Sequence, residues 1–415
     1  MLWYELEGAY FDLHINGLDV TPEVRESVLS VSVNQDVKGA TSCSLMLDDW
    51  DDDRQTYRFS RRRLVREGNT LTIFFGYAGG PRQCMGRFEL TEPTHRWQKG
   101  SRATYEIRGM DPIWRLNKNI MPRVIRDKNS TFSQVIKKIG ADYGLDVSQV
   151  RDTPTKITKQ VFKSRIQNDW NLLNQLCLAA GLAEPYIRHD PVTRKDRLIA
   201  TRDRFDIVAG HYILEQTAQG ETTRGHVPLD DFQSSWSLAD MPTEIEITGY
   251  DKKTGKSFNT IVKYNLDHKQ PDPIGIETNK DKKLHGYLKK FGGLVLKMIK
   301  VQQWDRKKAR WNRKTLRTYK IDTKQTAIEF ARSYFKVRER NYLYASFACP
   351  GIPDLLTHDI VEVIGSQGDV DGMFRVHQIE HTIEGGSRYT CKGQLSALVQ
   401  AESETQISPV VAEGA

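Results

Sequence analysis

Two ten-residue stretches, GRFELTEPTH at residues 86–95 and GMFRVHQIEH at residues 372–381, follow one pattern of spacing. Each begins with Gly and has Phe at +2, an aliphatic residue at +4, Pro or Ile at +7 and His at +9. Side chains at +2 and +4 share one face of a strand, and the change of phase before +7 indicates a β-bulge. The stretches therefore predict equivalent strands opened by glycine, with these matching residues: Gly86 and Gly372, Phe88 and Phe374, His95 and His381.

The sequence on both sides of the two stretches repeats as well. An apolar run that ends in glycine precedes each stretch, at 71–76 and 360–365, and Tyr-x-x-x-Gly follows each, at 105–109 and 389–393. Three aligned features in the same order favour a duplicated β-domain over coincidence. The shared position of His95 and His381 predicts a structural hydrogen bond in both copies, because a scaffold is rarely duplicated together with a catalytic site.

Helical patterns lie between the two β regions. Thr131-x-x-Gln134 has the form of a capping box and predicts a helix near 131–144. Asn168 is a good N-cap for a second helix near 168–181, which ends where Gly181 can act as a C-cap. The chain of 415 residues is therefore expected to hold two to four domains of mixed but mainly β character.

Composition excludes several classes of protein. No run of 18 apolar residues occurs, so no membrane-spanning helix is expected. Residues 1–18 lack the basic and apolar regions of a signal peptide. The five cysteines are scattered singly without metal-ligand spacing, which predicts free thiols in a reducing cytoplasm; they are Cys43, Cys84, Cys177, Cys349 and Cys391.

The basic residues are concentrated in one segment, 280–320. It holds fifteen Lys or Arg and two Asp, a net charge of +13, whereas the whole chain carries +8. Docking on an acidic protein, a solvated loop and nucleic-acid binding through charge and stacking are the three hypotheses that it raises. The candidate partner-binding residues are Trp304, Arg306, Lys307, Lys308, Arg310, Trp311, Arg313 and Lys314.

Three motifs were tested for chemistry and rejected. Residues 254–257 resemble the end of a phosphate-binding loop, but Tyr250 stands where the motif needs glycine, so a hairpin turn is predicted. The run of aspartates at 48–53 lacks the alternating ligands of a calcium loop and is predicted to be a solvated loop. Residues 368–372 are likewise predicted to form a hairpin turn.

Four stretches resemble the phage late-control D family, the baseplate hub proteins of contractile tails, which is related to the N-terminal part of the VgrG spike of type VI secretion. Three lie at 17–46, 68–110 and 168–182. The fourth and most specific runs from a helix at 327–340 through Gly351-x-Pro353-x-Leu355 to His381. The chain departs from the family at His358, where glycine is common in the turn before the strand.

The resemblance implies a mainly β fold with α+β insertions, built from two tail-tube-like β-barrel domains and small helix-containing connecting domains. We expect the first barrel at 1–115, a connecting region at 116–240, the second barrel at 241–400 and a flexible tail at 401–415. A basic insert at about 266–321 and a helix at 323–340 interrupt the second barrel. Three copies then carry six barrels, which matches a sixfold tail tube to a threefold spike.

The function implied by the resemblance is that of a structural baseplate hub with no catalytic, cofactor-binding or metal-binding residues. The expected partners are further copies in a homotrimer, the tail tube, the central spike, the baseplate wedge proteins and the tape measure, with DNA only in transit. The expected location is the tail baseplate of a virion, assembled in the cytoplasm of the bacterial host. Two alternatives stay open: a tail-tip peptidoglycan hydrolase, whose paired carboxylates have no fixed sequence spacing, and a nucleic-acid-binding tail component that uses the basic segment.

Overall fold

The computed structural model describes residues 8–397 except 38, 61–65, 100–101, 126–129, 155–160, 164–166, 202–211, 218–221, 224, 237–241, 252–255, 266–269, 274–293, 302–314, 319–342, 366–370 and 386–387. Two compact units divide the chain. The first comprises residues 1–235 and 344–396, and the second comprises 236–343 and 397–415. The chain is mainly β with a few helices, so the fold class predicted from the sequence is confirmed.

Seven strands near the N-terminus form the first half of a large sheet. Their order in the sheet is β3-β4-β9-β8-β7-β1-β2. The bounds are β1 (Ala9–Ile15), β2 (Leu18–Asp19), β3 (Val28–Asp36), β4 (Ser42–Asp48), β7 (Thr70–Tyr77), β8 (Gln83–Arg96) and β9 (Thr104–Met110). A turn of helix α1 (Thr21–Val24), the 3-10 turn η2 (Arg25–Ser27) and the small hairpin of β5 (Trp50–Asp51) and β6 (Thr56–Tyr57) complete this part.

Seven later strands repeat that order one for one. Their order is β16-β22-β25-β24-β23-β14-β15, so β16 corresponds to β3, β24 to β8 and β23 to β7. The bounds are β14 (Tyr212–Glu215), β15 (Val227–Pro228), β16 (Asp231–Trp236), β22 (Leu343–Pro350), β23 (Ile360–Ile364), β24 (Gly372–Glu384) and β25 (Arg388–Ala397). One difference is that β14 pairs with β23 in parallel, whereas β1 pairs with β7 antiparallel.

The pairing registers match as closely as the strand order. Gly86 lies opposite Ile73 and Gly372 opposite Val363, so the two glycines hold the same place in their hairpins. Further along, Gly109 lies opposite Cys43 and Gly393 opposite Phe347. We call the two seven-stranded parts the first and the second repeat.

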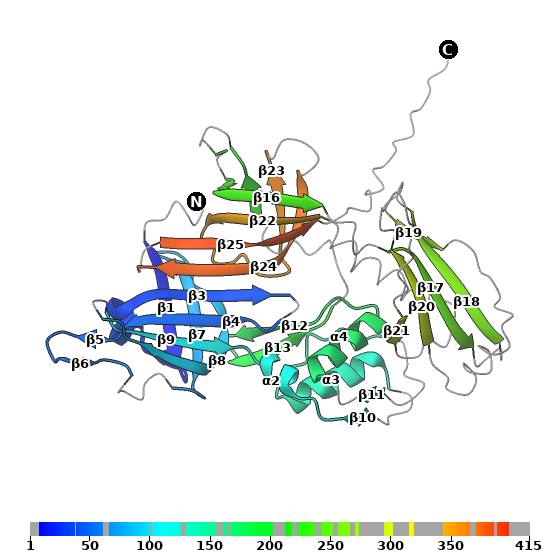
Figure 1. Cartoon of the computed structure of the whole chain (residues 1–415), viewed down its shortest axis with the longest axis horizontal. Helices are drawn as coiled ribbons and strands as arrows, with labels where there is room; N and C mark the ends of the chain where they lie inside the picture. Colours follow the sequence, from blue (N-terminus) through cyan, green and yellow to red (C-terminus); the bar gives the residue numbers. More distant parts are fainter. Residues whose placement is uncertain are drawn as a thin grey trace, which may run out of the picture. The chain divides into compact units, whose positions relative to one another are not determined.

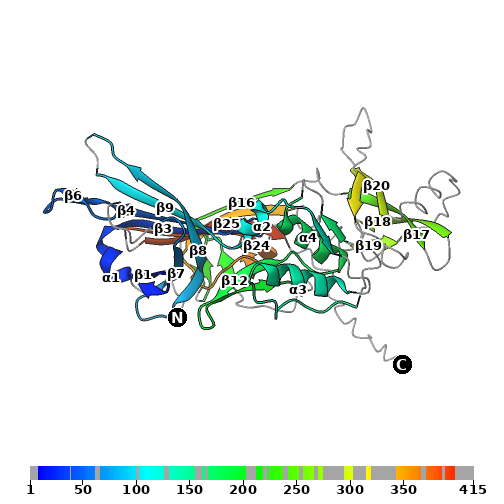
Figure 2. The ribbon, with the colours of Figure 1, turned by 90° about the horizontal axis from the view of Figure 1, so that it is seen from below.

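The two repeats belong to one 14-stranded sheet. Strand β24 joins them, because it pairs antiparallel with β3, from Gln378 opposite Asp36 to Glu384 opposite Ser30. Figure 1 shows β16, β22, β25, β24 and β3 stacked in that order from the top of the view. The β8–β9 hairpin extends away from β3 and β4 in Figure 2.

A helical region connects the repeats along the chain. It contains α2 (Ile113–Lys118), β10 (Arg123–Ile125), α3 (Phe132–Asp142), β11 (Val161–Lys163), α4 (Asp169–Ala179), β12 (Tyr186–Asp190) and β13 (Lys195–Ile199). The capping box of Thr131 and Gln134 is present, and the Asn168 side chain accepts a hydrogen bond from the Asn171 N–H at 2.7 Å. Both predicted helix starts are therefore confirmed.

The second unit holds a separate five-stranded sheet of order β19-β18-β17-β20-β21. Its strands are β17 (Pro242–Asp251), β18 (Lys256–Asn265), β19 (Gln270–Pro273), β20 (Leu294–Val301) and β21 (Thr315–Thr318). Asp251 pairs with Lys256 in the antiparallel β17–β18 pair, and Lys256 begins strand β18, not the helix that a phosphate-binding loop needs. Residues 252–255, on which part of the predicted turn at 254–257 falls, lie outside the described residues. Strands β20 and β21 lie within the basic segment.

Some predictions fall on residues that the structure does not describe. The helix at 323–340, the tail at 401–415 and all eight candidate partner-binding residues, from Trp304 to Lys314, lie outside the described residues. None of the described helices is long and apolar enough to cross a membrane. All five cysteines are free, as predicted.

Candidate assembly interface

The seam between the repeats is closed by polar contacts as well as by the β24–β3 ladder. The Gln35 side chain donates to the carbonyl of Met85 at 3.3 Å and accepts from the N–H of Thr357 at 3.1 Å. The Tyr77 hydroxyl donates to the carbonyl of Gly351 at 2.8 Å. These contacts join the first repeat to the second, so the two repeats form one packed body.

The glycine and the phenylalanine of the motif have the same backbone conformation and equivalent pairing partners in the two repeats. Gly86 has φ 150° and Gly372 has φ 149°, values that favour glycine over residues with a side chain. Phe88 and Phe374 are both buried, and each lies opposite an aliphatic residue, Leu71 or Val361. The glycine opening turns the strand so that the aromatic ring enters the core.

The two histidines of the motif differ in their surroundings. His381 is fully buried, and its Nδ1 lies 2.9 Å from the Tyr389 hydroxyl and 3.3 Å from the Sγ of Cys391. His95 is one-third exposed, and its Nε2 lies 3.4 Å from the carboxylate of Asp49. Each imidazole contacts a polar group of its own repeat, but only the second copy is enclosed.

The turn before the equivalent strands β7 and β23 explains the departure at His358. His358 has φ 75°, and its N–H donates to the carbonyl of Val376 at 3.0 Å. Gly68 holds the equivalent place with φ 81° and donates to Leu90 at 2.8 Å. His358 thus adopts the left-handed conformation that glycine adopts freely at this turn. Its ring stacks on Tyr186, with the ring centroids 4.1 Å apart.

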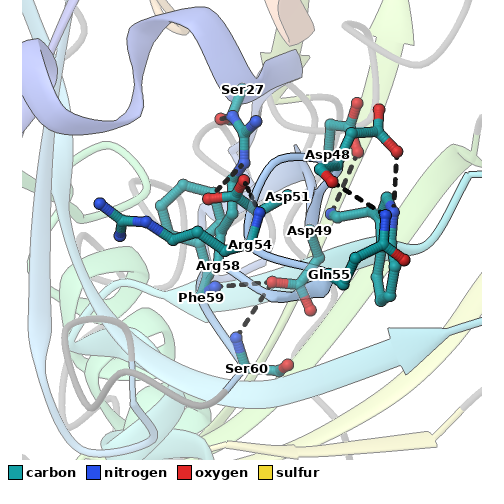
Figure 3. Close-up of polar contacts among 11 residues, drawn as sticks. Ser27, Asp48, Asp49, Asp51, Arg54, Gln55, Arg58, Phe59 and Ser60 are labelled. Atoms are coloured by element: carbon teal, nitrogen blue, oxygen red, sulfur yellow. Dashed lines mark hydrogen bonds and ion pairs between the residues drawn. The ribbon is translucent and has the colours of Figure 1, made fainter.

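The aspartate run at 48–53 spans the end of β4 and the start of the β5–β6 hairpin, and Figure 3 shows several of its carboxylate contacts. The prediction of a solvated loop is wrong for part of the run, because Asp49 is fully buried and Asp48 pairs with Arg102 at 3.0 Å. Asp49 is buried and accepts from the N–H groups of Phe59 at 2.6 Å and Ser60 at 3.1 Å. Asp51 accepts from the Arg54 N–H at 3.1 Å. Among the described residues no group of three metal-ligating side chains occurs.

A cavity of about 350 Å³ lies between β8, β12 and residues 356–357. Burial raises the pKa of the Asp111 carboxyl on its wall to about 7. Its Oδ1 accepts from the Ile113 N–H at 3.0 Å and so begins helix α2. Asp196 contacts His189 at 2.7 Å and Arg87 at 3.5 Å. Asp111 and Asp196 of this wall are therefore held by a hydrogen bond and by ion pairs within the chain.

A buried ion pair holds the connecting region together. The Nζ of Lys163 lies 2.6 Å from Asp169 and donates to the carbonyl of Asn119 at 2.8 Å, and both charged side chains are fully buried. The Tyr143 hydroxyl donates to the same carboxylate at 2.5 Å. Strand β11, the start of α4 and the ends of α2 and α3 meet at this point.

β2 and β15 end the strand order of the sheet, and two further strand edges are open among the described residues. β16 pairs only with β22. β8 pairs with β7 up to Glu89, and from Glu92 to Arg96 it pairs with β9 alone. Sequence reasoning missed both edges, because β16 is short and polar and its partner strand lies more than a hundred residues away.

No protein-family model and no curated protein matches the chain, but solved structures do. A tail protein from Neisseria meningitidis is 11% identical, with a TM-score of 0.59, covering 94% of this chain and 96% of that one. The 43 kDa tail protein of prophage MuSo2 from Shewanella oneidensis is 13% identical, with a TM-score of 0.57 and coverage of 93% and 98%.

A type VI secretion component from E. coli, described as structurally similar to bacteriophage T4 tail proteins, is 10% identical. Its TM-score is 0.52, with coverage of 94% of this chain and 77% of that one. At such identities the likeness is one of fold. The chain has the fold of phage tail proteins and of related type VI secretion proteins, as the resemblance seen in its sequence implied.

Proposed function

We propose that this protein is the structural hub of a contractile tail baseplate, which adapts a sixfold tail tube to a threefold central spike. The observation that carries the proposal is the presence of two repeats with one strand order in a single sheet. Each repeat is an equivalent building block, so three copies of the chain supply six blocks in a ring. A homotrimer of this kind presents sixfold pseudosymmetry to one neighbour and true threefold symmetry to the other.

The eight strands between the two open edges support a ring. β16, β22, β25, β24, β3, β4, β9 and β8 follow one another by hydrogen bonding, with β16 at one end and the far part of β8 at the other. Open strand edges invite further strand pairing. Joining the end of one copy to the start of the next closes a ring and pairs both of these edges.

The face of these strands that points away from the core suits the lining of a channel. Ladders across the face run from Glu380 through Asn34 to Ser42, and from Glu384 through Ser30 to Met46 and Glu106. The side chains are mostly small, polar or acidic. We propose that this face lines the passage, because an acidic wall repels passing DNA and offers it few contacts.

The proposed role is binding and not catalysis. The partners that we propose are the tail tube, the central spike, the wedge proteins and the tape measure, in the tail baseplate of a virion assembled in the host cytoplasm. We propose that the two barrels of this function are the two repeats. The first lies within the expected 1–115, and the second adds β14, β15 and β16 to the strands after residue 342, whereas β17 to β21 form a separate sheet. The basic segment remains a candidate docking site for an acidic protein.

Deletion of the gene in a producing bacterium tests the proposal. We expect loss of complete contractile tails, restored by the gene in trans, and labelling of a tagged chain at the distal end of the tail tube. Complete, contractile tails without the chain would refute the hub function. Hydrolysis of purified cell wall by the purified chain would favour the hydrolase alternative instead.

A further inference from the structure

We propose that a row at the end of β8, formed by Pro93, His95 and Trp97, the residue directly after the strand, is a docking surface for the open edge of β16 in a second copy of the chain. This inference rests on the homotrimer of the proposed function and assigns the residues of its joint. In the second repeat the corresponding joint lies within the chain, where β24 pairs with β3.

The counterparts of the row identify it as a surface that lacks its cover. The repeated motif equates Pro93 with Ile379, His95 with His381 and Trp97 with Ile383. All three counterparts are fully buried. Trp97 is 66% exposed, and Pro93 and His95 are exposed as well. An exposed tryptophan flanked by exposed residues is unusual for a soluble surface and typical of an interface anchor.

The strand that pairs with the counterparts shows which neighbour the row lacks. Ile379, His381 and Ile383 pair with Gln35, Val33 and Val31 of β3. The strand that corresponds to β3 in the second repeat is β16. β16 stands at the opposite end of the eight-stranded order from β8, so the chain's own β16 occupies the other edge of the same sheet. A second copy supplies the β16 edge that fits.

The backbone of the row offers one hydrogen-bond donor fewer than its counterpart in the seam. Pro93 has no N–H, and it lies opposite Ile107 of β9 without needing one for that ladder. Because N–H groups alternate in direction along a strand, His95 directs its N–H to the same open side as Pro93. His381, the counterpart of His95, lies opposite Val33 across the seam. The new joint therefore has one backbone hydrogen bond fewer than the seam within the chain.

One charged pair fixes the proposed register. The Asp230 N–H donates to the carbonyl of Ala348 at 2.8 Å, and Ala348 corresponds to Ser44, which lies opposite Ser32. Asp230 is thus the counterpart of Ser32. Ser32 pairs with Thr382, the counterpart of Arg96. In the joint, Arg96 of one copy then lies directly opposite Asp230 of the next, where side chains are about 5 Å apart. Both residues are exposed in the single chain.

Sedimentation of the purified full-length chain over a range of concentrations tests the proposal. We expect wild type to form trimers and Trp97→Ala to weaken their association by about tenfold or more, as loss of an interface anchor does. Val192→Ala is the matched control, because Val192 is 87% exposed on another hairpin, and should associate as wild type does. Unfolding of each variant at low concentration checks that the single chain still folds.

A charge swap and a backbone block test the register. Arg96→Glu and Asp230→Arg should each weaken the trimer, and the double variant should restore it. His95→Pro should weaken it, whereas His95→Ala, which keeps the N–H, should weaken it less. Trimers that tolerate Trp97→Ala and both charge reversals would overturn the docking surface but leave the hub function standing. Single chains at every soluble concentration would overturn both the surface and the homotrimer.

Discussion

Phe88 and Phe374 are the residues at which sequence and structure agree most closely. Both were expected on equivalent strands, and both are buried next to a glycine of the same conformation. Spacing could predict them because a strand alternates its faces, so positions +2 and +4 stay together. The different exposure of His95 and His381 could not be predicted, because it depends on a strand from a distant part of the chain.

Truncation of either phenylalanine should destabilise the fold. Phe88→Ala and Phe374→Ala should each lower the free energy of unfolding by about 3–5 kcal/mol, since both leave a large cavity in a packed core. Urea unfolding of the purified chain measures the effect. Val192→Ala, at a site 87% exposed on another hairpin, is the control and should stay close to wild type. An unchanged midpoint for both phenylalanine variants would contradict the assignment of the repeat core.

The Lys163–Asp169 pair should be costly to break from one side. Lys163→Met leaves a buried carboxylate without its cation, which should cost about 3–5 kcal/mol of unfolding free energy. Arg115→Met, which removes the exposed ion pair between Arg115 and Glu89, should cost about 1 kcal/mol or less. Thermal and urea unfolding measure the stability of both variants. Equal losses for Lys163→Met and Arg115→Met would show that burial does not set the strength of the Lys163–Asp169 pair.

Asp111 predicts a specific dependence of stability on pH. Its pKa of about 7 in the folded chain exceeds the ordinary 3.8, so the folded state binds a proton that the unfolded state releases between these values. Stability contributed by the neutral form is therefore lost as pH rises from about 4 to 7. Asp111→Asn keeps an oxygen for the Ile113 N–H and should gain up to a few kcal/mol over wild type at pH 8, at about 1.4 kcal/mol per pKa unit.

The gain of Asp111→Asn should be absent at pH 4, where both proteins carry a neutral side chain at this site. Urea unfolding at pH 4, 6 and 8 compares the two proteins. A constant difference across the three pH values would show that the Asp111 carboxyl does not titrate between the folded and unfolded states in this window.

Among the helices and strands, those whose ends are set by neighbouring residues in the sequence could be predicted. The starts of α3 and α4 follow from side chains that cap their own helix, Thr131 and Asn168. The strands β14, β15 and β16 were missed, since 116–240 was assigned to a connecting region. These strands are short, and β14 and β15 pair in parallel, so their stability comes from neighbours far along the chain.

The paired glycines at 109 and 393 allow two strands to approach closely. A Cβ on Gly109 would lie 2.9 Å from the Sγ of Cys43, and one on Gly393 would lie 2.2 Å from the carbonyl of Gln378. Gly109→Ala and Gly393→Ala should therefore lower the free energy of unfolding by about 1–3 kcal/mol. The larger cost is expected at Gly393, where the obstacle is backbone.

Gly39→Ala is the control for the two glycine substitutions. The nearest atom to a Cβ at Gly39 is 3.5 Å away, an ordinary contact, so this variant should differ little from wild type. Chemical unfolding of the three variants gives the ranking. A larger loss at Gly39 than at Gly109 and Gly393 would contradict the close approach of the strands in the two repeats.

For the molecule as a whole, the sequence predicted the duplication of the β part but not the pairing of β24 with β3 that joins the two repeats. Matching motifs at 86–95 and 372–381 predict two similar β parts, and the structure has two repeats of equal strand order. Their union in one sheet through β24 and β3 depends on pairing between residues more than three hundred positions apart. No local pattern encodes such a pairing, so the open edges that it leaves could only be found in three dimensions.

A three-dimensional reconstruction of the assembled tail tip tests the central claim most directly. The account predicts three copies of this chain around the axis, with six repeats in one closed ring of strands between the tube and the spike. The density of β16 should run beside residues 92–96 of β8 in the next copy. A ring of any other number of copies, or repeats that lie outside the wall of the channel, would contradict it.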